Sequence, residues 1–368
     1  MKKYVVLTGS KNNAGDFLIK YRGKQLLNAL VEGVQIVDID RWRPLTHEQL
    51  DAINSSNGLI LLGGPALRPE MYPTIYPLTS NLNDISVPIV SMGIGWKSHA
   101  GQWESTKNYF FTPSTRKLLD RMAADGYMSS VRDYHSLNAL LMNGYDNFSM
   151  TGCPVLYDLD FVGKPFVGPK RFDKIGFSLG VAFADSQKMT NQMQRLILKT
   201  KEHFADSEFV VALHHAIGRH DESFRNWFDK NGIVWKDISG SHESMVDFYT
   251  SCDFHLGYRV HAHIFMSSIS RPSLLVAEDG RGTALRSVLG GMIYDAYDFR
   301  SNLTLVDKVV NRLTRFSEPQ LVMPRLFEKE IIANIEYDRN NNYAFSAGVR
   351  NRINDLFPVM KQFILQLP

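Results

Sequence analysis

The chain has 368 residues, 44% of them hydrophobic and 21% charged, and its formal net charge is +3. This composition excludes a disordered chain. The nearly balanced charge argues against a dedicated nucleic-acid-binding protein, which usually concentrates basic residues on one face. The two cysteines, Cys153 and Cys252, form no CxxC spacing, so neither a disulfide framework nor a zinc site is expected.

The first ten residues, MKKYVVLTGS, have a basic start followed by a short apolar run. This run passes directly into polar residues, which favours a first core strand over a signal peptide. No apolar run approaches the roughly 20 residues that a membrane helix needs. We therefore expect a cytoplasmic protein. The amphipathic stretch at residues 349–367 also allows peripheral contact with the inner face of a membrane.

In the first part of the chain, short apolar runs alternate with segments of helical periodicity. Strands are predicted at residues 4–8, 34–39, 58–62, 87–92, 127–131 and 148–152, and helices at 17–30, 47–54, 114–124 and 134–142. The loop after the first strand, GSKNNAGD, matches neither GxGxxG nor a P-loop, so it predicts no dinucleotide or nucleoside triphosphate site. Its Asn13 and Asp16 are candidates for lining a cleft, although a helix N-cap is the simpler interpretation.

Further candidates follow the later strands of this part. Gly64 lies in LLGGP, and glycine at a strand end indicates either a tight turn or a close approach to the backbone. His99, in KSHAGQW, is either a surface histidine or a site residue. Arg132 either pairs with Asp133 or binds an anion, because a guanidinium group matches the geometry of carboxylate and phosphate.

Residues 154–172 are rich in proline and glycine and lack periodicity, which predicts a linker between two domains. The alternation then restarts, with strands predicted at 174–179, 208–214, 233–238, 253–258 and 273–277 and helices at 186–204, 222–231 and 243–251. We therefore expect an α/β fold with two Rossmann-like, doubly wound domains that face a cleft. Their predicted extents are residues 1–160 and 161–330, and a helical tail at 331–368 is expected to pack across both.

The stretch at residues 251–291 concentrates the strongest candidates. Arg259 and His261 follow a predicted strand where an apolar helix begins, and a polar loop from Glu278 through Arg281 follows the next strand. In open α/β sheets, ligands bind outside the carboxyl ends of the strands and near helix N-termini. Two arginines and a histidine at such an edge predict a receptor for a small anion, with a proton-transfer group beside it.

Seven of the eleven histidines lie between His214 and His263, so a metal site has to be considered. The two histidines of an HxH pattern on a helix point about 200° apart, and the chain has no HExxH motif, so no metal site is predicted. His255 alternates with its neighbours along a strand, which favours a hydrogen-bonded core residue. His215 is kept as a candidate for binding substrate.

Several separate stretches together resemble one family, the polysaccharide pyruvyl transferases. The matching stretches are, in chain order, NNAGD, LLGGP, SMGIGW, SSVRDYHSLNALLMNG, PVLYDLD and GYRVHAHIFMSSISRPSLLVAEDG. Their order and spacing span most of the chain. The resemblance implies a two-domain fold similar to glycosyltransferase type B, with the active site in the cleft.

The resemblance also implies an activity. Such an enzyme uses phosphoenolpyruvate, with no cofactor and no metal, to place a pyruvate ketal on a sugar or a lipid-linked oligosaccharide. By position, the family's Arg-x-His pair corresponds to Arg259 and His261, its other donor-binding arginine to Arg132, and a histidine of its first domain to His99. The two arginines would hold phosphate and carboxylate, and His261 would act as acid or base. Residues 278–281 depart from the family's tyrosine or lysine pattern, which leaves the acceptor open.

Two other functions remain open. A glycosyltransferase of the same fold would use a nucleotide sugar, and a non-catalytic carbohydrate-binding protein would keep the fold without the chemistry. The joint presence of Arg132, Arg259 and His261 favours the enzyme. Trp96 and Trp103 are candidates for stacking on sugar faces, with core packing expected for at least one of them.

Overall fold

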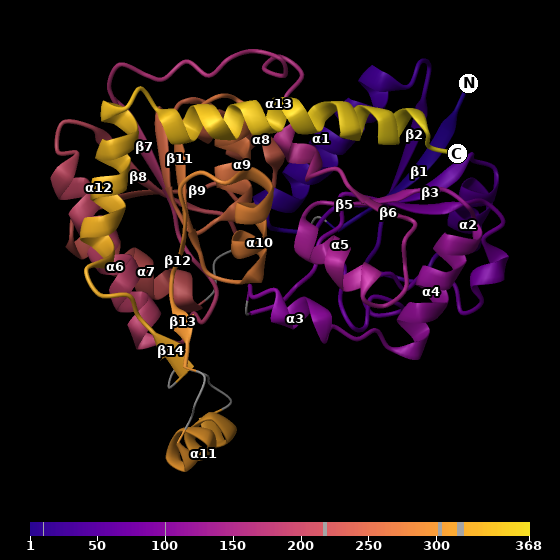
Figure 1. Cartoon of the computed structure of the whole chain (residues 1–368), viewed down its shortest axis with the longest axis horizontal. Coiled ribbons are helices and arrows are strands. Elements are labelled where there is room, and N and C mark those ends of the chain that lie inside the picture. The colour runs from indigo at the N-terminus through magenta and orange to yellow at the C-terminus, as the bar shows by residue number, and fades with distance from the viewer. Residues whose placement is uncertain (10, 100, 216–218, 301–303, 315–319) are drawn as a thin grey trace.

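The structure is a computed structural model of residues 1–368, and it describes all of them except 10, 100, 216–218, 301–303 and 315–319. Two α/β parts lie side by side, and a long helix crosses both (Figure 1). Each part is built on a parallel sheet, so the expected α/β class is confirmed. The predicted domain boundaries after residues 160 and 330 remain a prediction.

The first part contains a four-stranded parallel sheet in the order β2-β1-β3-β4. Its strands are β1 (Lys3–Thr8), β2 (Gln35–Asp40), β3 (Gly58–Leu62) and β4 (Ile89–Met92). A second parallel pair, β5 (Ser129–Val131) with β6 (Phe148–Met150), continues beyond β4. The helices of this part are α1 (Ala14–Leu30), α2 (His47–Asn54), α3 (Glu104–Lys107), α4 (Pro113–Ala124) and α5 (Tyr134–Leu141).

The second part contains a six-stranded sheet in the order β12-β11-β10-β7-β8-β9, parallel throughout. Its strands are β7 (Lys174–Ser178), β8 (Glu208–Leu213), β9 (Val234–Asp237), β10 (Phe254–Gly257), β11 (Ser273–Ala277) and β12 (Ile293–Asp295). Its helices are α6 (Gln187–His203), α7 (Arg219–Lys230), α8 (His242–Thr250), α9 (Val260–Ser268) and α10 (Gly280–Leu289).

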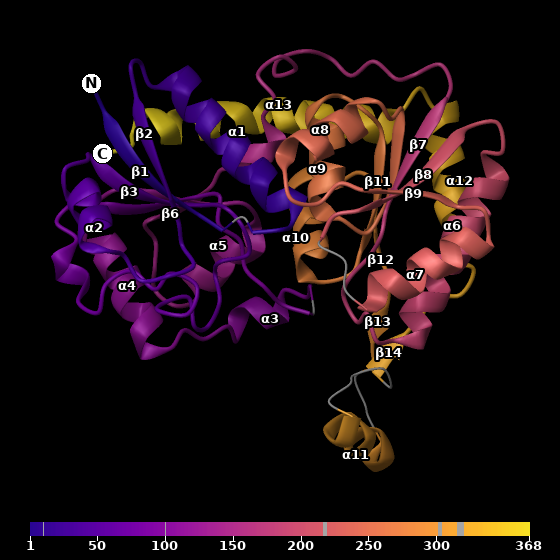
Figure 2. The ribbon, with the colours of Figure 1, turned by 180° about the vertical axis from the view of Figure 1, so that it is seen from behind.

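The chain ends in three helices, α11 (Leu305–Thr314), α12 (Phe327–Asn340) and α13 (Ala344–Leu365). A short antiparallel ribbon of β13 (Asp298–Phe299) and β14 (Leu321–Val322) carries α11 away from the body (Figures 1 and 2). α13 packs against α1 in the first part and against α9 and α10 in the second. Its end is fixed beside β1, because Tyr4 donates a hydrogen bond of 2.6 Å to the carbonyl of Pro368.

α9 shows why the two parts form one core. Every residue of this helix after Val260 is buried, and its apolar side chains join the same hydrophobic cluster as β1, β3 and β4. A helix that is buried all round loses the one-sided apolar pattern of a surface helix. The described residues include no helix long and apolar enough to cross a bilayer.

One prediction about local structure is wrong, and a second is refined. The polar loop predicted at residues 278–282 is only two residues long, because α10 begins at Gly280 and Asp279 is its N-cap. The predicted linker at residues 154–172 opens with a buried segment, since Val155, Leu156 and Tyr157 are fully covered by their neighbours. The proline and glycine content of this stretch did not predict that its first residues are part of the core.

Candidate active site

The candidate site lies where the carboxyl edges of the two sheets face each other. Three backbone hydrogen bonds join the two parts there: Ala14 N to His214 O at 3.1 Å, Gly240 N to Asn12 O at 2.8 Å, and Gly280 N to Ser98 O at 2.9 Å. Each connects residues that follow a strand, so loops and helix starts from both parts surround one region. This is where the open-sheet rule places a ligand.

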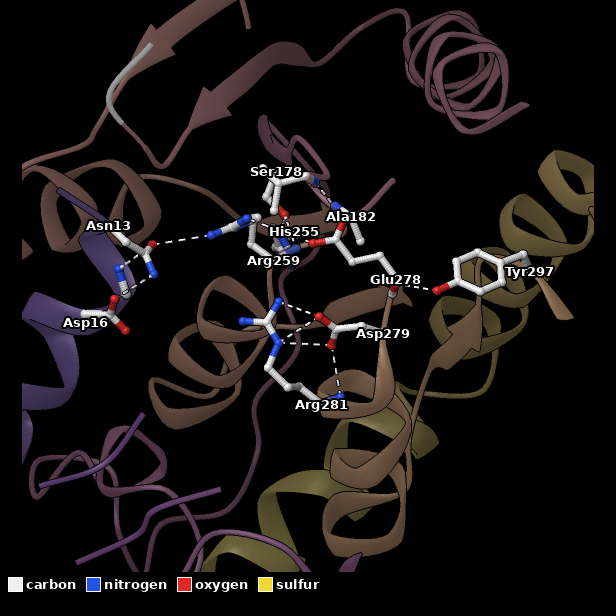
Figure 3. Close-up of polar contacts among 12 residues, drawn as sticks. Asn13, Asp16, Ser178, Ala182, His255, Arg259, Glu278, Asp279, Arg281 and Tyr297 are labelled. Carbon is white, nitrogen blue, oxygen red and sulfur yellow. Dashed lines mark hydrogen bonds and ion pairs between the residues drawn. The ribbon is translucent and has the colours of Figure 1, made fainter. Parts of the chain in front are cut away.

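Arg259 enters this region from the N-cap position of α9. Its backbone N–H donates to Ser178 Oγ at 3.0 Å, which fixes the turn after β10. Gly257 makes the turn possible, because a Cβ there would lie 2.4 Å from the Ser178 carbonyl oxygen. The side chain does not cap α9 and instead reaches toward Asn13 and Glu278 (Figure 3).

The Arg259 guanidinium group is buried and only loosely held. Nη2 donates to Asn13 Oδ1 at 3.3 Å, and Nη1 lies 3.9 Å from Glu278 Oε1. Within the described residues, Nη1 has no hydrogen-bond partner. Burial lowers the pKa of Arg259, although Glu278 opposes this shift.

Glu278, a predicted substrate ligand, faces Arg259 without a hydrogen bond to it. Its Oε2 accepts backbone N–H groups of Val181 at 2.6 Å and Ala182 at 2.8 Å (Figure 3). Its carbonyl accepts the Tyr297 hydroxyl at 2.8 Å. Burial raises the pKa of Glu278, and Arg259 acts in the opposite direction. The carboxylate is therefore fixed on one side and faces Arg259 on the other.

Asp279 and Arg281 form a second charged pair beside it. Arg281 Nε lies 2.9 Å from each carboxylate oxygen of Asp279, and Nη2 lies 2.6 Å from Oδ2. Burial opposes ionisation of Asp279, but Arg281 outweighs it and lowers the pKa of that carboxyl. Arg281, predicted to bind substrate, thus presents its charge to the cleft while remaining tied to its own helix terminus.

His261 lies in the first turn of α9 and packs directly on α1 of the other part. A Cβ at Gly15 would lie 2.2 Å from His261 Nδ1, so only glycine leaves room for the ring. His261 Nε2 is buried, and no described residue forms a hydrogen bond with it. Burial, then Arg132, Arg281 and Arg259, hold its pKa well below 6.5, so the ring is neutral at pH 7.

Arg132 pairs with Asp133, and its role as an anion ligand remains a prediction. Its Nε lies 3.5 Å from Asp133 Oδ2, while its Nη2 is buried and lacks a hydrogen-bond partner among the described residues. Asp133 caps α5 by accepting from Ser136 N at 2.7 Å. The side chain of Arg132 lies flat against Gly95, where a Cβ would be 2.0 Å from Nε. Arg132 Nη2 therefore has no hydrogen-bond partner among the described residues, and its charge acts on His261.

The remaining candidates take different positions. Asn13 is the N-cap of α1, as the simpler interpretation had it, and it also donates to Asp16 Oδ2 at 3.1 Å (Figure 3). Burial raises the pKa of Asp16 despite nearby arginines. His215 is half-buried, and burial followed by Arg259 and Arg281 lowers its pKa to about 3. Gly64 follows β3 with a φ of +76°, and His99 is exposed beside Phe183.

Sequence reasoning missed Arg41, which directly follows β2 at the same edge of the first sheet. Its guanidinium group is buried beside Tyr76. The signal was available, because Arg132 and Arg259 were identified by the same position at the end of a strand. Arg68 and Lys97 were also missed. Burial and neighbouring cations lower the pKa of both.

A cavity of about 390 Å³ adjoins this cluster, and residues of both parts line it. Asp279 belongs to its wall, as do His99, Trp103 and Tyr297. Trp103 is 47% exposed and stacks on His135 with 3.9 Å between the ring centroids, whereas Trp96 is fully buried. Core packing therefore accounts for Trp96, and Trp103 offers a ring face at the cavity.

The histidines form no metal site in the described part of the chain, where no group of three or more His, Cys, Asp or Glu side chains is arranged to hold an ion. His255 is a core residue, as predicted, because its two ring nitrogens lie 2.8 Å from Ser178 Oγ and Ser273 Oγ. Its imidazole is fully used in joining β7, β10 and β11.

Comparison with known proteins gives a family and a fold. The family model described as polysaccharide pyruvyl transferase matches residues 13–279. A UDP-GlcNAc 2-epimerase from Neisseria meningitidis, bound to UDP-GlcNAc, aligns with a TM-score of 0.51 at 11% identity over 99% of this chain and 100% of that chain. The corresponding enzyme of Methanocaldococcus jannaschii gives a TM-score of 0.51 at 11% identity over 98% and 100%.

S. aureus MnaA, solved with UDP, gives a TM-score of 0.50 at 12% identity over 92% of this chain and 97% of that chain. At such identities the likeness shows the fold alone, which is of the glycosyltransferase type B kind. No curated protein matches the chain.

Proposed function

This chain belongs to the polysaccharide pyruvyl transferase family, and from that premise we propose that it moves the enolpyruvyl group of phosphoenolpyruvate onto a sugar to form a pyruvate ketal. Family membership supports a transferase that acts in polysaccharide synthesis. The donor and the ketal product are our proposal, and the site geometry supports them.

One observation carries the proposal. Arg259 Nη1, Arg132 Nη2 and His261 Nε2 are three buried polar atoms without hydrogen-bond partners among the described residues, and they come from both parts. Burying an unpaired polar group costs about 1–3 kcal/mol, and one bound anion would satisfy all three atoms together. Phosphoenolpyruvate carries a carboxylate and a phosphate, which two guanidinium groups can bind with matched geometry.

His261 supplies the proton-transfer group in this scheme. Its low pKa makes it neutral before substrate binds, so it first acts as a base. A sugar hydroxyl adds to C2 of the donor, His261 takes the hydroxyl proton, and the imidazolium ion returns that proton to C3. A second hydroxyl then attacks C2 as phosphate leaves, and its proton departs with the phosphate. Sugar and phosphoenolpyruvate thus become ketal and inorganic phosphate.

The arginines stabilise the charge that this sequence moves. A preorganised donor in a site that excludes water contributes about 3–4 kcal/mol to a transition state, and general acid–base catalysis contributes roughly 10²–10⁴ in rate. The three cations near His261 disfavour its protonated form, and the negative charges of bound donor offset them.

The direct test is a panel of sugars incubated with phosphoenolpyruvate, followed by product mass and inorganic phosphate. We expect one class of sugar to gain a single pyruvate ketal, with one phosphate released per product. Failure with every sugar, combined with thermal stabilisation by a nucleotide sugar and not by phosphoenolpyruvate, would contradict the proposal and favour a nucleotide-sugar transferase.

A further inference from the structure

The search for a second ligand site leads to Arg41 at the edge of the first sheet. Its backbone N–H donates to Thr8 O at 3.0 Å, so it is fixed at the carboxyl ends of β1 and β2. Its guanidinium carbon lies 5.2 Å from the Tyr76 ring centre and 5.3 Å from that of Trp42. With 9% of its surface exposed, Arg41 is held rigidly in a place where open α/β sheets bind ligands.

Arg41 is a buried cation without a carboxylate in contact. Nη1 donates to the Tyr76 hydroxyl at 3.3 Å, while Nε is buried and unpaired within the described ranges. The buried arginines Arg22, Arg132 and Arg259 each have a carboxylate within 4.0 Å. Arg350, which has none among the described residues, donates to the Ser268 carbonyl and Asn354 instead. Among the described residues Arg41 has no carboxylate within 4.0 Å, and Asp16 acts on it from farther away.

Two glycines let the backbone approach the guanidinium group of Arg41 closely. A Cβ at Gly9 would lie 2.4 Å from Arg41 Nη2, and one at Gly64 would lie 3.9 Å from the same atom. Gly64 follows β3 with a positive φ that favours glycine. Bare backbone from the ends of β1 and β3 therefore flanks the guanidinium group on two sides.

Arg41 lies beside the reacting centre but does not act on His261. The cations that depress the pKa of His261 are Arg132, Arg281 and Arg259. Both Arg41 and Arg281 lower the pKa of Arg68, and both oppose the raised pKa of Asp16. The positive groups of the two sheet edges therefore adjoin, with Arg41 on the side away from His261.

We propose that Arg41, with Gly9 and Gly64, binds an oxyanion carried by the acceptor, so that the acceptor is an acidic sugar bearing a phosphate or a carboxylate. The inference rests on the proposed function, because it assigns the donor to Arg132 and Arg259. A guanidinium group binds either anion through paired hydrogen bonds. The acceptor's charge fills the position that the described residues leave without a carboxylate.

The test measures acceptor kinetics with phosphoenolpyruvate for galactose and mannose, each as the methyl glycoside, the uronic acid and the 1-phosphate. We expect the wild type to prefer one anionic form, which identifies phosphate or carboxylate as the source. Arg41→Gln should raise the KM of that form about 10- to 100-fold, with kcat and the KM of phosphoenolpyruvate unchanged. Arg43→Gln, an exposed neighbour, is the matched control and should change nothing.

Several results would overturn this site. A wild-type preference for methyl glycosides would do so, as would a weaker KM for phosphoenolpyruvate in Arg41→Gln. If Arg41→Gln unfolds at a lower temperature, Arg41→Lys keeps the charge and should recover part of the acceptor affinity. If no acceptor supports phosphate release, the proposed function fails separately. In that case, calorimetric titration of the 1-phosphates and uronic acids without phosphoenolpyruvate still tests Arg41. Equal binding heats in wild type and Arg41→Gln would refute the Arg41 site.

Discussion

The carboxyl edges of the two sheets differ in how their charges are balanced. On the second sheet, Arg259 lies 3.9 Å from Glu278 and Arg281 lies 2.6 Å from Asp279. On the first sheet, Arg41 has no carboxylate within 4.0 Å among the described residues, and Arg68 donates only to the Pro65 carbonyl at 3.1 Å. The arginines of the second edge have carboxylates within 4.0 Å, and Arg41 of the first edge has none among the described residues.

This difference separates two ways of preparing a site. On the second edge Asp279 fixes the orientation of Arg281 before a ligand arrives, which lowers the reorganisation that catalysis requires. On the first edge Arg41 is held in a rigid place without a carboxylate in contact, which favours recognition of an external anion. Substitutions on one edge at a time separate the two kinds of site.

The contact between Gly15 and His261 joins the edges and should have the largest effect. Gly15→Ala places a Cβ 2.2 Å from His261 Nδ1 and must displace the ring. We expect turnover to fall by roughly 10²–10⁴, as for His261→Ala, and the melting temperature to fall as well, because overpacking a buried contact costs about 1–3 kcal/mol. Steady-state phosphate release and thermal unfolding measure the two effects.

Gly348→Ala is the matched control for that substitution. Gly348 also lies in a helix, α13, but an added Cβ would meet nothing within 4 Å. It should stabilise the protein by up to about 1 kcal/mol and leave turnover unchanged. Normal turnover in Gly15→Ala would contradict the assignment of His261 as the proton-transfer group.

Arg259→Lys tests whether the second edge needs a guanidinium fork. Lysine keeps the charge but cannot make two parallel hydrogen bonds, so we expect kcat/KM for phosphoenolpyruvate to fall roughly 100-fold. Donor titration measures the change. Near-normal affinity would mean that Arg259 serves only the contacts with Asn13 and Ser178.

Glu278→Gln should have a smaller effect on the same edge. The amide oxygen can still accept from Val181 and Ala182, but the charge opposite Arg259 is lost. We expect about a tenfold fall in kcat/KM for phosphoenolpyruvate, because Arg259 is less well oriented. A loss larger than that of Arg259→Lys would show that Glu278 itself takes part in the chemistry.

The pKa of His261 gives the most delicate comparison. Burial and three arginines lower it well below 6.5, so the free ring should stay neutral as pH falls from 8 to 6. Arg281→Gln removes one cation and should move the titration to higher pH. NMR titration, with His261→Gln to assign the resonance, measures both. A wild-type His261 that titrates near 6.5 would contradict the electrostatic arrangement.

Much of the fold was predictable because strands and helices alternate with clear periodicity. α10 was missed because Asp279-Gly280-Arg281-Gly282 reads as a loop. Glycine at position 282 lets α10 pack closely on β11, because an added Cβ would lie 2.7 Å from the Ala277 Cβ. Such close approach between a helix and a strand cannot be read from local sequence.

The site was predictable where a cation directly follows a strand, as at Arg132 and Arg259. Arg41 obeys the same rule and could have been identified. The role of Gly15 could not, because its contact with His261 exists only after the two parts have come together. The bonds of Glu278 to Val181 and Ala182 were equally hidden, because they join residues almost one hundred positions apart in the sequence. Its role as a substrate ligand remains a prediction.

The central claim is that Arg132 and Arg259, from opposite parts, hold the same molecule of phosphoenolpyruvate. Calorimetric titration of phosphoenolpyruvate into wild type, Arg132→Gln, Arg259→Gln and the double variant tests it directly. We predict at least tenfold weaker binding in each single variant and a double variant that is less than additive, because both groups act on one small ligand. Unchanged affinity in either single variant would contradict the claim.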